Sequence, residues 1–183
     1  MLIRVADLQL HKLEFNQEFQ PGAIDFGSEV QQAGPLDSNG RAELIVEHRG
    51  HKHDIDDIRV VGKLDTVMEV GCARCLEPVR FRVNREFDLL YRPLGVDRRA
   101  EEVSISEADT EIGYYDGEGL LLEDVLREQV LLASPVKLIC REECRGLCPQ
   151  CGINLNLATC NCQQRSSDPR WAALSELKNK LQS

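Results

Sequence analysis

Two long stretches of alternating apolar and polar residues dominate the middle of the chain. From Val60 to Cys72, apolar or small residues fall on one side, and charged residues such as Lys63 and Asp65 fall on the other. Residues 79–84 alternate in the same way. Strict alternation is typical of a strand with one buried face, and two such strands around a short turn form an antiparallel hairpin. The pattern therefore predicts a long hairpin with Cys72 and Cys75 at its tip.

Shorter strands are expected on both sides of this hairpin. Leu8–Phe19 and Ala42–Glu47 are expected as strands on its N-terminal side, and residues 112–115 as a short strand on its C-terminal side. Residues 21–40 contain Gly, Pro and Asn and are expected to form a loop.

Two helices are expected in the second half of the chain. In residues 120–133, Leu122, Leu126 and Val130 form one row at four-residue spacing, with Leu132 beside it. Pro135 ends this helix. A terminal helix is expected to begin at Ser167-Asp168-Pro169, where Asp168 suits the N-cap and proline suits the first turn.

These elements predict an α+β protein. Residues 1–139 are expected to form an antiparallel β domain with a packed helix. Residues 140–183 are expected to form a small cysteine-rich zinc-binding segment followed by the terminal helix. A chain of 183 residues is long enough for one core and a small metal-bound appendage.

Six of the eight cysteines lie between Cys140 and Cys162. The centre of this run, residues 148–152 (CPQCG), has the form of a metal knuckle, in which two thiolates three positions apart bind one cation and a glycine permits the tight turn. A tetrahedral zinc ion needs four ligands. The expected zinc ligands are Cys144, Cys148, Cys151 and Cys162, with Cys140 and Cys160 as alternatives.

Disulfides and redox-active thiols are the competing interpretations of this run. Residues 1–15 contain charges at Arg4, Asp7 and Lys12, so no signal peptide is expected. No apolar run approaches the roughly 20 residues that span a bilayer. A cytoplasmic or comparable reducing location follows, where clustered cysteines usually bind metal. A thioredoxin-type pair would need a strand before it and a helix after it, whereas Pro149 indicates a loop.

The pair Cys72 and Cys75 is separate in the sequence from this run. It supplies either half of a further metal site or two small buried residues at a strand end. The second interpretation is preferred, because no His or Cys follows at a useful spacing.

The net charge of −9 excludes a uniformly basic nucleic-acid-binding protein. The acidic excess lies in residues 1–139, where it forms either a face for a basic protein partner or a solvated surface. Arg74, Arg80 and Arg82 form a small basic patch near the hairpin tip. This patch is the candidate nucleic-acid contact, with simple solvation as the alternative.

The sequence argues against an enzyme. It contains no GxSxG, Walker or HExxH motif. A structural four-thiolate site also leaves no open coordination position for a substrate. No small-molecule substrate is evident.

Three motifs resemble the YceD-like family of large ribosomal RNA subunit accumulation proteins. They are the cysteine run of residues 140–162 followed by DPRWxxL, the CARCLEP segment of residues 72–78, and the helix region of residues 114–140. The resemblance implies a non-enzymatic factor that supports accumulation of large-subunit (23S) ribosomal RNA and ribosome biogenesis. The expected partner is ribosomal RNA, a ribosomal protein, or both. The alternative is an acidic adaptor or chaperone for a basic protein, without direct RNA contact.

Overall fold

The computed structural model describes residues 1–48, 54–96 and 112–162. The expected terminal helix from Asp168 onward lies outside these residues. The described helices and strands are β1 (Leu2–Arg4), α1 (Val5–Leu8), β2 (Leu13–Phe19), β3 (Val30–Gln32), β4 (Leu36–His48), β5 (Asp54–Gly71), β6 (Pro78–Pro93), β7 (Ile112–Tyr115), β8 (Gly119–Leu121) and α2 (Leu122–Ala133).

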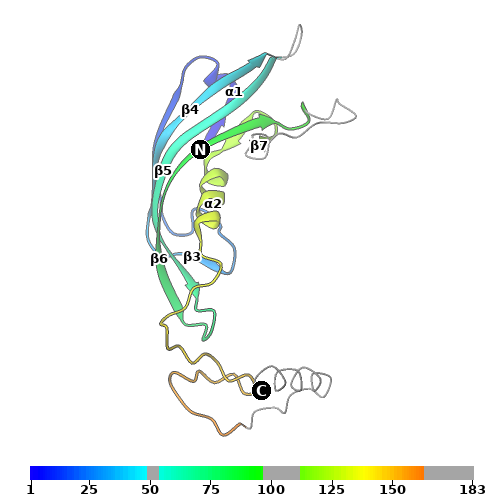
Figure 1. The fold of residues 1–183 in the computed structure, drawn as a ribbon. Coiled ribbons are helices and arrows are strands. Elements are labelled where there is room, and N and C mark those ends of the chain that lie inside the picture. The colour runs from blue at the N-terminus through cyan, green and yellow to red at the C-terminus, as the bar shows by residue number, and fades with distance from the viewer. Residues whose placement is uncertain (49–53, 97–111, 163–183) are drawn as a thin grey trace, which may run out of the picture.

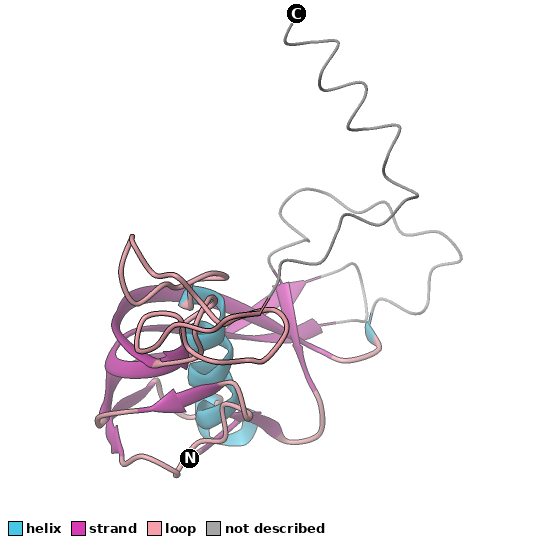
Figure 2. Ribbon diagram, turned by 90° about the horizontal axis from the view of Figure 1, so that it is seen from below, coloured by secondary structure: helices cyan, strands magenta, loops and turns pink. Residues whose placement is uncertain are grey.

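A curved sheet with strand order β2-β4-β5-β6-β7 forms the body of the protein (Figure 1). Its strands pair antiparallel except for β6 and β7, which are parallel. Strand β3 pairs with the far end of β5, where Val30 lies opposite Val70. Helix α2 lies along the concave side, and the strands curve around it (Figures 1 and 2). The predicted α+β architecture with a packed helix is confirmed.

The predicted hairpin is the longest feature of the sheet. Strands β5 and β6 pair from Ile58 opposite Tyr91 to Gly71 opposite Pro78. On the side toward α2, Leu64 and Met68 are almost fully buried. The hairpin continues past the end of β4 and places its turn beside the segment that follows α2 (Figure 1).

Two expectations on the N-terminal side were wrong in their bounds. The strand expected at Leu8–Phe19 begins only at Leu13. Leu8 is instead the last residue of α1. The loop expected at residues 21–40 contains β3 and the start of β4. Gly40, read there as a loop signal, lies within the sheet, where an added Cβ would approach the ring of Phe15 to 2.7 Å.

Helix α2 begins two residues later than expected and uses the predicted row. Leu122, Leu126 and Val130 are completely buried against the sheet. Leu132, expected beside this row, is 63% exposed, because its position turns away from the sheet. Among the described residues, no helix is both long and apolar enough to cross a bilayer.

The packing of α2 predicts that substitutions of two leucines in this helix lower the free energy of unfolding by very different amounts. Leu126→Ala should lower the free energy of unfolding by about 2–5 kcal/mol, because it leaves a cavity in the core. Leu132→Ala should change it by less than about 0.5 kcal/mol, because Leu132 is largely exposed. Urea denaturation followed by circular dichroism measures both values. Equal effects would contradict this packing of α2.

Candidate metal centres

The hairpin turn brings two cysteine side chains together below a tight backbone loop. The N–H of Cys72 donates to the carbonyl of Glu77 at 2.8 Å, and the N–H of Leu76 donates to the carbonyl of Cys72 at 3.0 Å. Leu76 has a φ of 64°, a left-handed conformation that glycine adopts more easily. Cys72 is fully buried and Cys75 is 4% exposed. The turn therefore presents two thiols toward the protein.

The chain after α2 lies directly against this turn. The N–H of Ala73 donates to the carbonyl of Leu138 at 2.8 Å, and the N–H of Leu147 donates to the carbonyl of Arg74 at 3.0 Å. Gly146 fits here because a Cβ at its position would lie 2.9 Å from the same Arg74 carbonyl oxygen. Residues 138–147 thus form a strap across the hairpin tip, which we call the tip strap.

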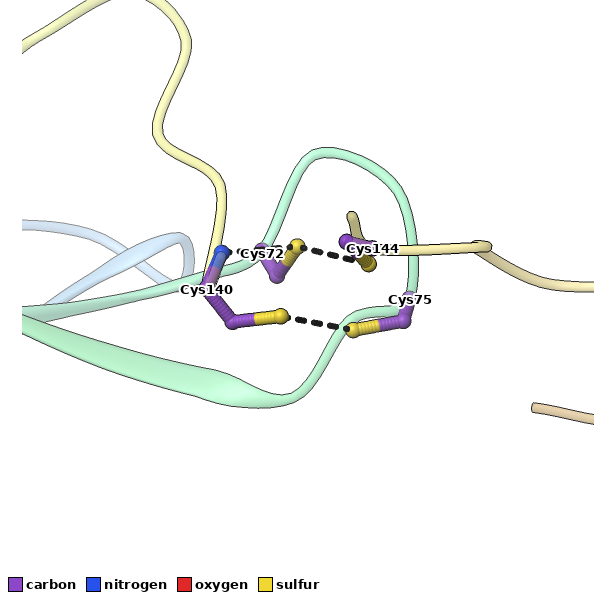
Figure 3. A group of neighbouring side chains, drawn as sticks. All are labelled: Cys72, Cys75, Cys140 and Cys144. Atoms are coloured by element: carbon purple, nitrogen blue, oxygen red, sulfur yellow. Dashed lines mark hydrogen bonds between the residues drawn. The ribbon is translucent and has the colours of Figure 1, made fainter. Parts of the chain in front are cut away.

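Four cysteines meet where the tip strap crosses the hairpin tip (Figure 3). The sulfur atoms of Cys72 and Cys144 lie 3.9 Å apart, and those of Cys75 and Cys140 lie 3.7 Å apart. All four sulfurs lie within 4.8 Å of one another, so this group could hold a metal ion. We call Cys72, Cys75, Cys140 and Cys144 the first thiol group.

Polar N–H groups surround the first thiol group. The Cys72 sulfur accepts hydrogen bonds from the backbone N–H groups of Cys140 at 3.3 Å and Arg74 at 3.5 Å. The Cys144 sulfur accepts one from the side-chain amide of Asn156 at 3.4 Å. Donors around a metal-bound thiolate orient it and stabilise its negative charge.

The thiols of this group influence one another's ionisation. Burial raises the pKa of Cys72, but N–H donors from Arg74 and Cys140 outweigh it and bring the pKa to about 6. The N–H of Glu77 favours the Cys75 thiolate, but burial and the neighbouring thiols raise the pKa of Cys75 to about 12. Thiolates this close repel one another, so the four thiols cannot all be ionised in the absence of a cation. A cation between them would remove that repulsion.

The second thiol group consists of Cys148, Cys151, Cys160 and Cys162, whose sulfurs also lie within 4.8 Å of one another. The N–H of Cys148 donates to the carbonyl of Ile153, and Gly152, with a φ of 74°, donates to the carbonyl of Cys148, both at 2.9 Å. N–H groups of Cys151 and Gln150 lower the pKa of Cys148 to about 6. This group too could hold a metal ion.

The structure divides the cysteines differently from the expected ligand set. Cys144, expected together with Cys148, Cys151 and Cys162, lies in the first thiol group, because the tip strap holds it against the hairpin tip. Cys160, expected only as an alternative ligand, completes the second thiol group. The six-cysteine run therefore serves two groups rather than one.

The alternative ligand Cys140 and the separate pair also find their places in the first thiol group. Cys72 and Cys75 are buried, as the preferred interpretation held, yet their sulfurs face those of Cys140 and Cys144. The signal for this arrangement was the C-x-x-C spacing, which the hairpin tip shares with the CPQCG knuckle.

The three arginines of the basic patch all contact groups of the protein itself. Arg74 donates from Nη1 to the carbonyls of Glu142 and Cys144, both at 3.0 Å. Arg80 pairs with Glu69 across the hairpin at 2.9 Å, and Arg82 pairs with Asp65 at 2.9 Å. Hydrogen bonds from Arg82 and, with a smaller effect, from Asn84 lower the pKa of the Asp65 carboxyl group. Arg74 thus fastens the tip strap, a contact that charge patterning did not reveal.

Comparison with known proteins places these features in one family. The sequence model described as "Large ribosomal RNA subunit accumulation protein YceD" matches residues 60–178. An uncharacterized protein of Mycobacterium tuberculosis is 35% identical over 146 residues, which cover 74% of this chain and 66% of the relative. A protein of Arabidopsis thaliana named "Large ribosomal RNA subunit accumulation protein YCED homolog 1, chloroplastic" is 25% identical, with 68% of this chain and 46% of the relative covered.

A further relative extends the similarity along nearly the whole chain. The uncharacterized protein YlbN of Bacillus subtilis is 22% identical, with 92% of both chains covered. No solved structure matches this chain.

Arg74 and Arg80 lie in the same patch but should respond differently to removal. Arg74→Ala deletes two hydrogen bonds to the tip strap, one exposed and one partly buried, which together contribute about 1–3 kcal/mol. Amide exchange in residues 141–147 should accelerate about tenfold, the factor that corresponds to about 1.4 kcal/mol. Arg80→Ala removes only an exposed ion pair and is the matched control, with exchange there unchanged. Equal exchange in the two variants, measured by hydrogen–deuterium exchange, would contradict the fastening role.

Proposed function

Because the chain belongs to the YceD family of large ribosomal RNA subunit accumulation proteins, we propose that it supports accumulation of large-subunit (23S) ribosomal RNA and ribosome biogenesis. The family match over residues 60–178 carries this proposal, since it includes most of the hairpin, the tip strap and both thiol groups. The protein acts by binding ribosomal RNA, a ribosomal protein, or both.

The metal in this proposal is structural zinc. Four thiolates in a compact group suit zinc, a soft-ligand cation that prefers tetrahedral coordination. A closed four-sulfur site leaves no position for a substrate, so the protein acts as a binding factor rather than as an enzyme. A cytoplasmic, reducing location keeps the eight thiols available for the metal.

Direct RNA binding would use the arginines of the hairpin. The side chains of Arg80 and Arg82 are 70% and 71% exposed, so phosphate oxygens can reach them. A phosphate must compete there with Glu69 and Asp65, which already bind these arginines. Binding of RNA at this face would therefore be modest per arginine and sensitive to salt.

A protein partner is the second candidate, and a hollow beside α2 favours it. The hollow has a volume of about 450 Å³ and lies between β7, β8 and α2. Tyr114 and Leu121 on its rim are 51% and 46% exposed. Asp116, Asp124 and Glu128 line the same hollow. Apolar surface beside carboxylates suits a basic, partly apolar segment of a ribosomal protein.

Depletion of the protein in cells should lower the amount of 23S ribosomal RNA relative to 16S ribosomal RNA. Quantifying both RNAs after depletion tests the proposed role. An unchanged ratio would contradict it. Capture of the full-length protein from lysate, with and without RNase, then separates the two binding modes, since only a direct ribosomal-protein contact persists after RNase treatment.

Two pairs of substitutions serve as reciprocal controls in this experiment. Arg80→Ala with Arg82→Ala should reduce RNA-dependent capture and the salt dependence of RNA binding, because phosphate contacts are lost. Asp116→Asn with Asp124→Asn should reduce capture that survives RNase. If neither pair changes capture, both surfaces are wrong as contact sites, even where depletion confirms the cellular role.

A further inference from the structure

The hairpin tip and the CPQCG knuckle have the same backbone structure. In each, the first cysteine donates its N–H to the carbonyl five residues later, at 2.8 Å for Cys72 and 2.9 Å for Cys148. In each, the residue after the second cysteine donates back to the first cysteine, from Leu76 at 3.0 Å and from Gly152 at 2.9 Å. Leu76 and Gly152 have φ angles of 64° and 74°. The hairpin tip therefore has the backbone form of the CPQCG knuckle, with leucine in place of its glycine.

The sulfur separations in the first thiol group fit an ion at its centre. Sulfurs bound to zinc at about 2.3 Å in a tetrahedron lie about 3.8 Å from one another. In this group the Cys72 and Cys144 sulfurs are 3.9 Å apart, the Cys75 and Cys140 sulfurs are 3.7 Å apart, and all four lie within 4.8 Å of one another. A disulfide would require about 2.05 Å and would join the thiols only in pairs. Four mutually close sulfurs are the arrangement that one tetrahedral cation needs.

The two thiol groups differ in what they connect. Cys75 and Cys140 are separated by 65 positions, and Cys72 and Cys144 by 72, so the first group links the hairpin to the chain after α2. The second group lies entirely within residues 148–162. An ion in the first group would close a long loop, whereas an ion in the second would organise one short segment.

We propose that the first thiol group binds its own zinc ion, and that this ion clamps the tip strap onto the hairpin tip. The second ion folds residues 148–162 locally. Asn154 and Asn156 then place the second knuckle against the clamp, since Asn154 donates to Glu77 at 3.1 Å and Asn156 donates to the Cys144 sulfur. This inference rests on the zinc assignment above and not on the ribosomal role.

The clamp predicts that two cysteine substitutions each remove one zinc ion but accelerate amide exchange in different segments. Full-length protein, purified with zinc under reducing conditions, should carry about two zinc ions by native mass spectrometry. Cys75→Ser should reduce this to about one, and exchange in residues 138–147 should accelerate while β4, β5 and β6 stay protected. Cys151→Ser should also leave about one ion, but with faster exchange in residues 148–162 and a protected Ala73 amide.

Ala73→Ser is the matched control, because it changes an exposed residue of the same knuckle without removing a ligand. It should keep both ions. If Cys75→Ser also accelerates amide exchange in the strands, Cys140→Ser replaces it. Cys140 is a ligand of the same group but lies in the tip strap, outside the sheet.

Each contrary result has a distinct meaning. Wild-type protein without any zinc overturns the zinc assignment together with the clamp. One ion in the wild type that Cys75→Ser and Cys140→Ser both retain, or two ions that both variants retain, overturns the clamp and leaves the second site standing. A cellular role in 23S ribosomal RNA accumulation would be untouched by either result.

Discussion

The position of the cysteine segment depends on four sulfur atoms that two distant parts of the chain bring into one small volume. Cys72 and Cys75 come from the hairpin turn, and Cys140 and Cys144 come from the strap that follows α2. Hydrogen bonds at Ala73 and Leu147, the Arg74 guanidinium and the Cys140 N–H, which donates to the Cys72 sulfur, also join the two parts. Apolar packing here is small: among the residues that the structure describes, Val79, Ile139 and Leu147 are the apolar side chains that pack on the buried cysteines. A bound ion would supply the stability that apolar packing does not provide here.

The sheet makes this arrangement possible by holding the turn at the end of a long, well-supported hairpin. The core under α2 fixes β5 and β6 along most of their length, and β3 supports β5 as far as Val70. Strand pairing thus supports the hairpin almost to its tip, where the tip strap contacts it. In this arrangement the YceD-type hairpin motif and the cysteine run are parts of one structural unit, although they are far apart in sequence.

Local periodicity predicted the parts of the fold that depend on neighbouring residues. The alternation from Val60 onward identified the hairpin, and the row of Leu122, Leu126 and Val130 identified the buried face of α2. The short elements β1, α1, β3 and β8 were missed. Strand β3 pairs with β5, where Val30 lies opposite Val70. Pairing with a strand so distant in the sequence leaves no pattern in the residues of β3 itself.

The thiol groups illustrate the same limit at the candidate site. Sequence spacing identified the CPQCG knuckle but could not show which distant cysteines join it, because four ligands need proximity in space rather than in sequence. The similarity of the two knuckles was also hard to recognise in the sequence, because Leu76 occupies a left-handed position where glycine is usual. Matching the C-x-x-C spacings of residues 72–75 and 148–151 would have pointed to two sites.

Anomalous diffraction at the zinc absorption edge, from crystals of the full-length protein, tests the central claim most directly. The account predicts about two zinc peaks in each chain, one surrounded by the sulfurs of Cys72, Cys75, Cys140 and Cys144 and the other by those of the second thiol group. A single peak in the second group, with Cys72 and Cys75 as free thiols or in disulfides, would contradict it.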